Sequence, residues 1–233
     1  MILRHLRLPG IVPYPHASKI QDLLVSRFLA HKASPSSGPP PSPVIITAQF
    51  HPVYTCGRRE IGSVFPSQQE YLRADGQAEF YEALRGGQTT FHGPGQLIAY
   101  PIIDLKRHGL TPRSYVCLLE KSLMGTCQRF GVETRTTEHP GVWVSEESKI
   151  AALGIHLRRN VSSHGIGLNV NTDLKWFGRI VACGLEGKRT TSLEAEGVEG
   201  VSVDEVGEVF VREFADRLEG VDDVQRMAEG DVD

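Results

Sequence analysis

Apolar residues recur at helical spacing in three stretches of the chain, and each stretch follows residues that commonly begin helices. The first follows a capping-box motif at Ser18–Gln21, the second an N-cap and first-turn proline at Thr111–Pro112, and the third a capping-box motif at Ser202–Glu205. The apolar faces are Ile20, Leu24 and Phe28; Val116, Leu119, Leu123, Cys127 and Phe130; and Val206, Phe210, Phe214 and Leu218. The pattern predicts three amphipathic helices.

Runs rich in β-branched and other apolar residues separate these helices and predict strands. The runs are Ile2–Leu8, Val44–Gln49, Leu97–Leu105, Gly141–Val144, Ile150–Leu157 and Gly165–Asn171. The polar residues 145–148 between two of the runs predict a hairpin turn. Because strands and helices mix without strict alternation, we expect an α+β fold, with a mixed β-sheet flanked by helices.

Two segments fall outside this pattern. Ala33–Pro43 holds five prolines and no large apolar residue, which predicts a flexible Pro/Ser insertion on the surface. Gly220–Asp233 carries five acidic residues against one arginine, so we expect an acidic, disordered tail. The expected organisation is therefore one domain over residues 1–219, with an insertion at 33–43, followed by a tail at 220–233.

Composition narrows the classes of function. A chain of 233 residues with a net charge of −3 has room for one sizeable core and no general affinity for nucleic acid. No apolar run approaches the roughly 20 residues that span a bilayer. Residues 1–31 are interpreted as the first strand and helix rather than a removable leader. The cysteines form no C-x-x-C pair and predict free thiols in a reducing compartment: Cys56, Cys117, Cys127 and Cys183.

Three segments carry candidate chemistry. Arg85–Gln96 contains four glycines, a proline and His92, which fits either a loop around a neutral ligand or a structural turn; it matches no phosphate-binding motif. Lys149 opens an apolar strand and by itself is typical of a solvated lysine. Cys183 precedes a glycine, and a lone cysteine is more often a core residue than a nucleophile. The nearby histidines lack zinc-site spacing, so no metal is expected.

Taken together, four motifs resemble the lipoyl(octanoyl) transferase family. They are an R-G-G-x-x-T-[FY]-H-G-P-G-Q loop at Arg85–Gln96, a K-[IV]-A-[AS]-[IL]-G segment at Lys149–Gly154, an H-G-[IF]-[AG]-[LIF]-N strand at His164–Asn169, and a P-C-G turn at Ala182–Gly184. The likeness runs from about Leu3 to Leu193. The departures are Ala182 in place of the usual proline, and the insertion at 33–43, which suggests a eukaryotic, fungal member.

The resemblance implies a fold like that of the lipoate and biotin protein ligases, and a role for each matched residue. Cys183 would be the nucleophile and Lys149 its catalytic partner. The implied acyl pocket comprises Arg85, Gly86, Gly87, Gln88, Thr89, Thr90, Phe91 and His92, with Ala152, Leu153 and Gly154 and with Gly165, Ile166 and Gly167.

The implied reaction moves an octanoyl group from octanoyl-acyl carrier protein, through a thioester on Cys183, to the lysine of a lipoyl domain. The expected acceptors are lipoyl domains of 2-oxoacid dehydrogenase E2 subunits and the glycine cleavage H protein. No cofactor, nucleic acid or membrane is implied, and we expect a monomer that is mitochondrial if eukaryotic and cytoplasmic if bacterial. The alternatives are an ATP-dependent lipoate or octanoate protein ligase of the same fold, and a non-catalytic lipoyl-domain binder.

Two arginine pairs are candidates for steering an acidic protein partner toward this net-negative chain. Arg58-Arg59 follows the Val44–Gln49 strand, and Arg158-Arg159 ends the strand that begins beside Lys149. Each pair on its own is also consistent with ordinary solvated arginines.

Overall fold

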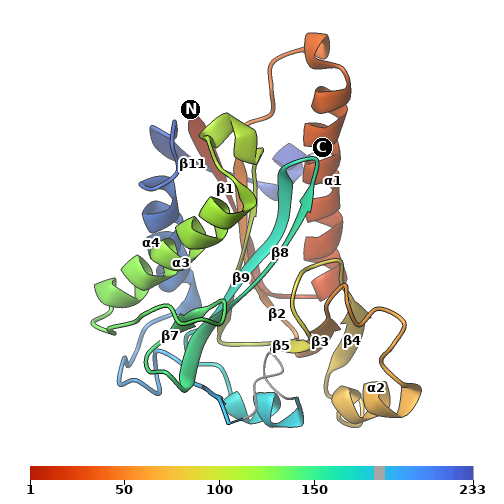
Figure 1. Ribbon diagram of the computed structural model, residues 1–233, viewed down its shortest axis with the longest axis vertical. Coiled ribbons are helices and arrows are strands. Elements are labelled where there is room, and N and C mark those ends of the chain that lie inside the picture. Colours follow the sequence, from red (N-terminus) through yellow and green to blue (C-terminus); the bar gives the residue numbers. More distant parts are fainter. Residues whose placement is uncertain (181–186, 233) are drawn as a thin grey trace.

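A mixed β-sheet forms the centre of the computed structural model, which describes residues 1–180 and 187–232 (Figure 1). Its strands follow the order β10-β8-β9-β6-β2-β1-β11, and β7 also pairs with β8. The strands are β1 Ile2–Val12, β2 Val44–Phe50, β6 Gln96–Ile102, β7 Val142–Trp143, β8 Ser148–Arg158, β9 Val161–Asn169, β10 Arg189–Thr190 and β11 Asp223–Met227. β1 pairs in parallel with both neighbours and β10 pairs in parallel with β8, whereas the other pairs are antiparallel.

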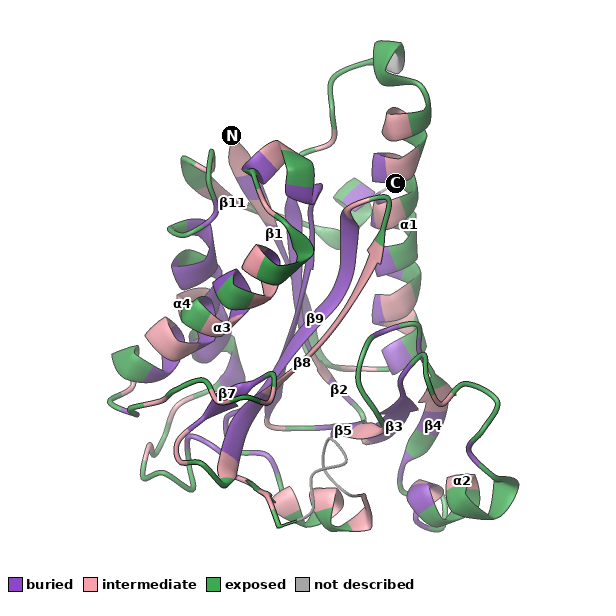
Figure 2. Cartoon of the chain, in the orientation of Figure 1, coloured by how far each residue is buried: buried purple, intermediate pink, exposed green. Residues whose placement is uncertain are grey.

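Helices cover both faces of this sheet because its central strands bury both sets of alternating side chains. In β2, Ile45 packs with α3 (Pro112–Arg129) and α4 (Val203–Ala215), whereas Val44 and Ile46 pack with α1 (Tyr14–Ala33) on the other face. Figure 2 shows the outcome: β9 is buried along its length, and each helix turns its exposed side away from the sheet. Short 3₁₀ helices connect these elements at Pro35–Ser37, Leu105–His108, Leu174–Arg179 and Glu229–Val232, called η1, η2, η3 and η5.

A second, three-stranded sheet lies beside the lower part of the main one (Figure 1). Its order is β4-β3-β5, with β3 Val53–Cys56, β4 Glu79–Glu82 and β5 Thr90–His92, and α2 (Pro66–Arg73) packs against it. Phe91 of β5 stacks on Trp176 of η3, with ring centroids 5.2 Å apart. This stacking holds η3 beside the small sheet.

The expected mixed sheet flanked by helices is confirmed, but one predicted helix start is wrong. α3 and α4 begin at the predicted caps: the capping box predicted at Ser202 forms, and Thr111 forms one with Ser114 as well. α1 instead begins at Tyr14, four residues before Ser18. Tyr14 is buried against Phe50, and Ala17 is buried too, so the apolar face starts earlier than the capping pattern indicated. None of the helices in the described part of the chain is long and apolar enough to cross a membrane.

The prediction of a disordered tail after Gly220 is also wrong for most of that segment. β11 pairs in parallel with β1 from Ile2↔Asp223 to Leu6↔Met227. Without it, β1 would be an edge strand with unpaired backbone groups. The tail also buries Val232 at 3% exposure, which adds apolar contact that the acidic composition conceals. Residues 33–43 lie outside the three hydrophobic core clusters, and this region includes the end of α1 and all of η1.

Candidate active site

A cavity of about 550 Å³ lies between strands β8 and β9 of the main sheet and the loop that precedes β5. The two strands contribute residues 152–154 and 164–167 to its wall, and the loop contributes Arg85, Gly87 and Gln88. Glycine occupies positions 154, 165 and 167 because other parts of the protein come close there: a Cβ atom would lie 3.1 Å from the Gly86 oxygen, 2.2 Å from the Ala99 oxygen and 3.3 Å from Gln96 Oε1, respectively. Leu153 and Ile166 supply apolar surface between the glycines.

The loop comes close to the strands because glycines meet at the contacts. A Cβ atom on Gly57 would lie 1.8 Å from the Gly87 oxygen, and one on Gly154 would lie 3.1 Å from the Gly86 oxygen. Gly86 N donates a hydrogen bond to the Ile155 oxygen at 2.9 Å, which fixes the loop on β8. Gly87 has φ +84°, a conformation that favours glycine.

Arg85 holds this loop together from inside. Its Nε donates to Thr55 Oγ1 at 3.1 Å, and one terminal nitrogen donates to the Gly86 and Gln88 oxygens at 2.9 and 3.0 Å. The side chain is buried at 6% exposure. The guanidinium therefore organises the cavity wall through the backbone of the loop, in addition to facing the cavity.

A chain of side-chain hydrogen bonds fixes the tautomer of His92. Asn169 Nδ2 donates to the Thr191 oxygen at 2.9 Å, so Asn169 Oδ1 faces Gln96 and accepts from its Nε2 at 2.8 Å. Gln96 Oε1 then accepts from His92 Nδ1 at 2.8 Å. Because the chain ends on a backbone carbonyl, which only accepts, His92 carries its proton on Nδ1 and leaves Nε2 as an acceptor. Burial and the nearby Arg85 charge lower the pKa of His92 to about 4, so this imidazole is neutral at physiological pH.

His164 and Tyr100 form another part of the cavity wall. The rings lie 5.5 Å apart in an edge-to-face arrangement. His164 has a left-handed backbone, with φ +54°, and its N–H donates to Gln21 of α1. Burial, together with the Arg85 charge, lowers the pKa of His164 to about 3. The cavity therefore presents a second neutral imidazole.

Lys149 is buried at 7% exposure and lines the main cavity from the start of β8. Its Nζ donates to the Pro140 oxygen at 3.0 Å and lies 4.5 Å from the centroid of the Trp143 ring. A carbonyl oxygen and a cation–π contact both stabilise an ammonium group. The sequence alone favoured a solvated lysine at this position, and the structure instead places a buried cation at the cavity.

Cys183 lies outside the described residues, which resume at Gly187. The described residues just before and just after that segment lie close to the site. Ile180 packs with the cluster around Phe91, and Thr190 pairs with Lys149 between β10 and β8. A small second cavity of about 20 Å³ lies between these flanks and is lined by Phe177, Lys149 and Thr190, among others.

The three described cysteines do not line either cavity. Cys56 and Cys127 are fully buried, and burial raises the pKa of both thiols, that of Cys127 to about 12. Cys117 is exposed on α3. No group of three or more His, Cys, Asp or Glu side chains that could hold a metal ion occurs among residues 1–180 and 187–232.

The structure brings most of the sequence-predicted pocket residues to one cavity. The lining residues among them are Arg85, Gly87, Gln88, Thr90, His92, Ala152, Leu153, Gly154, Gly165, Ile166 and Gly167. Three predicted residues do not line it. Gly86 carries the backbone contact to β8, Thr89 donates to Glu60 Oε2 at 2.9 Å, and Phe91 faces the core of the small sheet.

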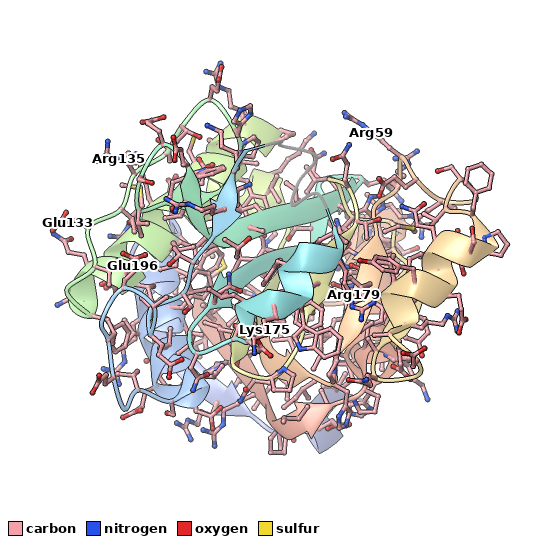
Figure 3. The ribbon with its side chains drawn as sticks, turned by 90° about the horizontal axis from the view of Figure 1, so that it is seen from below. Arg59, Glu133, Arg135, Lys175, Arg179 and Glu196 are labelled. Carbon is pink, nitrogen blue, oxygen red and sulfur yellow. The ribbon has the colours of Figure 1, made fainter. Side chains whose placement is uncertain are left out.

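Sequence reasoning missed several lining residues, which are Arg59, Glu60, Tyr100, His139, Pro140 and His164. The sequence does point to His164, because it is the first residue of the His164–Asn169 motif. It does not point to Arg59 and Glu60, because contacts between distant parts of the chain bring their loop to the cavity: Gly57 packs on Gly87, and Arg58 N donates to the Arg85 oxygen at 2.9 Å. In Figure 3, seen from below, Arg59 projects outward at the periphery, and Arg179 lies between η3 and α2, where it donates to the Tyr71 oxygen.

Comparisons with known proteins agree with the motifs. The sequence model of one protein family, described as Lipoyl protein ligase A/B catalytic domain, matches residues 16–215. A protein named probable octanoyltransferase from Schizosaccharomyces pombe is 53% identical over 189 residues, which cover 81% of this chain and 83% of the relative. The mitochondrial octanoyl-[acyl-carrier-protein]:protein N-octanoyltransferase of Homo sapiens is 39% identical over 209 residues, covering 88% and 89%.

Solved structures show the same fold at low sequence identity. A crystal structure of lipoate-protein ligase A bound with ATP aligns with a TM-score of 0.67 at 16% identity, over 97% of this chain and 90% of that one. A putative lipoate protein ligase from Thermoplasma acidophilum with bound lipoic acid aligns with a TM-score of 0.65 at 17% identity, over 97% and 89%. The resemblance predicted from the four motifs is confirmed.

Proposed function

Because the chain belongs to the lipoyl protein ligase A/B catalytic domain family, we propose that it transfers an octanoyl group from octanoyl-acyl carrier protein to a lysine of a lipoyl domain. The observation that carries this proposal is the cavity of about 550 Å³, with Lys149 buried in its wall and the flanks of the Cys183 segment beside it. The cavity is large enough for a medium acyl chain, and Leu153 and Ile166 offer it apolar surface.

The proposed chemistry is two acyl transfers through Cys183. In the first, the Cys183 thiolate attacks the thioester carbonyl carbon, a new C–S bond forms, and the phosphopantetheine thiolate leaves and takes up a proton. In the second, the acceptor amine attacks the acyl-enzyme, the amide C–N bond forms, the amine loses a proton, and the Cys183 sulfur leaves. A thioester is converted to an amide, which is downhill and requires no ATP.

Lys149 is proposed to act on both steps. Its ammonium lies among fixed partners, the Pro140 oxygen and the Trp143 ring, so its position does not depend on the substrate. Lowering a cysteine pKa from about 8.5 to about 7 gives only about a threefold net gain, because the weaker thiolate is a poorer nucleophile. Backbone donors to the tetrahedral oxyanion contribute roughly 10²–10³ each. Lys149 therefore contributes mainly as a proton carrier: its ammonium gives a proton to the leaving phosphopantetheine thiolate in the first step, and the resulting neutral amine takes the proton of the attacking amine in the second.

The acyl pocket is proposed to select chain length partly by burial. About six methylenes buried at about 0.8 kcal/mol each contribute roughly 5 kcal/mol of binding, which disfavours short chains. The neutral His92 and His164 add no charge that an apolar chain would have to desolvate. Arg85 presents a cation to the same space, but its hydrogen bonds to Thr55 and the loop satisfy much of its donor capacity.

Acceptors of the reaction are proposed to be lipoyl domains of 2-oxoacid dehydrogenase E2 subunits and of the glycine cleavage H protein. The relatives from Danio rerio, Homo sapiens and Saccharomyces cerevisiae are named mitochondrial, and we propose the same compartment for this chain. The ATP-dependent ligase alternative has less support, since the solved lipoate protein ligases match at 16–17% identity and show the fold alone.

One assay separates the two activities. The protein is mixed with a lipoyl domain and either octanoyl-carrier protein without ATP or free octanoate with ATP. We expect octanoylation only in the first mixture. Product only in the second would identify a ligase, and product in neither would support a non-catalytic binder.

A further inference from the structure

His92 has one ring nitrogen that the described residues leave unused. Nδ1 is paired with Gln96, whereas Nε2 has no hydrogen-bond partner in the described part of the chain. The unpaired side-chain atoms that the protein covers completely there are Thr134 Oγ1 and His164 Nδ1, and His92 Nε2 is not among them. The ring lines both the main cavity and the small second cavity. Nε2 therefore faces the space where the two cavities meet.

This meeting place is where the proposed acyl transfer occurs. Five of the described residues line both cavities, namely Thr90, His92, Lys149, Ala152 and Gly167. Lys149 is the proposed proton carrier, and the small cavity is lined by Phe177 and Thr190, which lie on the two sides of the segment that holds Cys183. In the proposed reaction the carbonyl of the acyl-enzyme lies near both Lys149 and Cys183. His92 Nε2 therefore faces the place where the second nucleophile attacks.

The hydrogen-bond chain behind His92 ends on a residue that also holds Lys149. Gln96 and Asn169 are direct partners on β6 and β9, so their side chains lie on the same face of the sheet. Gln96 Nε2 donates to Asn169 Oδ1 at 2.8 Å, and Asn169 Nδ2 donates to the Thr191 oxygen at 2.9 Å. Thr191 N in turn donates to the Lys149 oxygen at 2.8 Å. The chain thus fixes the imidazole relative to Lys149.

The direction of the chain decides what Nε2 can do. Because a backbone carbonyl only accepts, each amide in the chain has a fixed orientation and His92 Nε2 is an acceptor. An acceptor does not stabilise the oxyanion of a tetrahedral intermediate, which requires donors. The reacting thiolates have no hydrogen to donate, whereas the attacking lysine amine has two. The pKa of about 4 keeps His92 from taking the proton that the amine gives up, which passes to Lys149.

We propose that Asn169 and Gln96 are positioning residues for the second transfer, which hold His92 Nε2 as the hydrogen-bond acceptor for the attacking lysine amine. One N–H of the amine points to Nε2, which directs the nitrogen lone pair at the carbonyl carbon. The amide C–N bond forms, the other proton passes to neutral Lys149, and the Cys183 sulfur leaves. The inference rests on the proposed function and adds to it the residues that orient the acceptor.

The experiment follows one octanoyl-enzyme with two nucleophiles. Octanoyl-enzyme is prepared from octanoyl-carrier protein and then mixed with a lipoyl domain, which attacks through its amine, or with the free thiol form of the carrier protein, which attacks through sulfur. The readout is the ratio of the amine rate to the thiol rate, followed by intact-protein mass spectrometry. Because the ratio is internal to each sample, a partly inactive preparation does not change it.

His92→Asn and His92→Gln form a matched pair. The asparagine amide takes the place of Nδ1 and keeps the contact with Gln96, but it leaves no acceptor at the place of Nε2. We expect its ratio to fall about tenfold, the size expected for one hydrogen bond. The glutamine amide reaches the place of Nε2 and offers an oxygen there, so its ratio should stay within about threefold of wild type.

A second pair tests the chain behind the imidazole. Asn169→Asp keeps the oxygen that accepts from Gln96, so its ratio should stay near that of wild type. Asn169→Leu has a similar size but no acceptor, so the Gln96 amide is free to invert and give His92 the opposite tautomer, and we expect the ratio to fall about tenfold. Nitrogen NMR of wild type should show the His92 proton on Nδ1, which tests the direction of the chain if Asn169→Leu does not fold.

The outcomes distinguish the inference from the function beneath it. Wild type that completes both transfers while His92→Asn or Asn169→Leu keeps the wild-type ratio would overturn the positioning chain and leave the transferase activity standing. A His92 proton found on Nε2 would overturn it as well. Wild type that forms no octanoyl-enzyme, or one that a lipoyl domain does not discharge, would overturn the proposed function and the inference together.

Discussion

Acid should destabilise this protein in a way that depends on His92. The pKa of His92 is lowered from 6.5 to about 4, chiefly by burial and then by the Arg85 charge. The folded state thus binds this proton less readily than the unfolded state, so stability is full above pH 6.5 and falls as pH drops from 6.5 toward 4. Because a tenfold difference in proton affinity between the two states corresponds to about 1.36 kcal/mol, this one residue costs about 2 kcal/mol of stability between roughly pH 7 and pH 5.

The assay is urea unfolding at about pH 7 and about pH 5, for wild type and His92→Asn. The asparagine amide keeps a donor where His92 Nδ1 meets Gln96 but does not titrate. Carboxylates and the other histidines titrate in both proteins, so the difference between the two reports chiefly on His92. We expect wild type to lose about 2 kcal/mol more than His92→Asn between the two pH values. Equal losses in the two proteins would refute the assignment of a buried, neutral His92.

The remaining predictions concern Lys149 and partner steering. Lys149→Arg should recover little of the activity lost in Lys149→Met, because charge alone has a small effect and a guanidinium does not give up its proton. Single-turnover rates near wild type for the arginine variant would contradict this. For steering, kcat/KM with octanoyl-carrier protein should fall steeply with salt, and a small octanoyl thioester should show little response. Charge reversal at Arg58 and Arg59 should flatten the carrier-protein curve, whereas reversal at 158–159 should leave it unchanged; identical curves for both substrates would exclude steering by either pair.

The sequence motifs do not distinguish the two arginine pairs, whereas the structure places one of them at the cavity. Arg59 lines the cavity, whereas Arg158 ends β8, nine residues or roughly 30 Å along the strand from Lys149. Arg159 lies in the following turn and accepts from Lys32 Nζ at the end of α1 through its backbone oxygen. Proximity in the chain to Lys149 therefore did not translate into proximity to the site.

The fold class followed from patterns with a clear physical basis. The apolar runs at Val44–Gln49 and Leu97–Leu105 predicted strands, which the structure forms as β2 and β6, and the caps of α3 and α4 form at the predicted residues. The start of α1 and the pairing of β11 were missed because tertiary contacts decide them. Tyr14 belongs to the helix because it packs on Phe50, and an acidic segment becomes a strand because β1 offers it an unpaired edge.

Sequence motifs predicted part of the cavity lining but not the contacts among the lining residues. Motifs placed Arg85, Lys149 and the strand residues 152–154 in one region, and the cavity contains them. Nothing in the spacing could show that Arg85 ties the loop to Thr55, or that Lys149 is buried over Trp143. These contacts join residues that are far apart in the chain, and a sequence pattern does not show which distant residues lie close together in the fold.

The central claim is that Cys183 carries the acyl group, and intact-protein mass spectrometry tests it most directly. The protein is mixed with octanoyl-carrier protein in the absence of a lipoyl domain, and the adduct is located by peptide mapping. The account predicts one added octanoyl group, on Cys183, that disappears when a lipoyl domain is supplied, and no adduct in Cys183→Ala. Substantial octanoylation of a lipoyl domain by Cys183→Ala, or an adduct on Cys56, Cys117 or Cys127 instead, would contradict it.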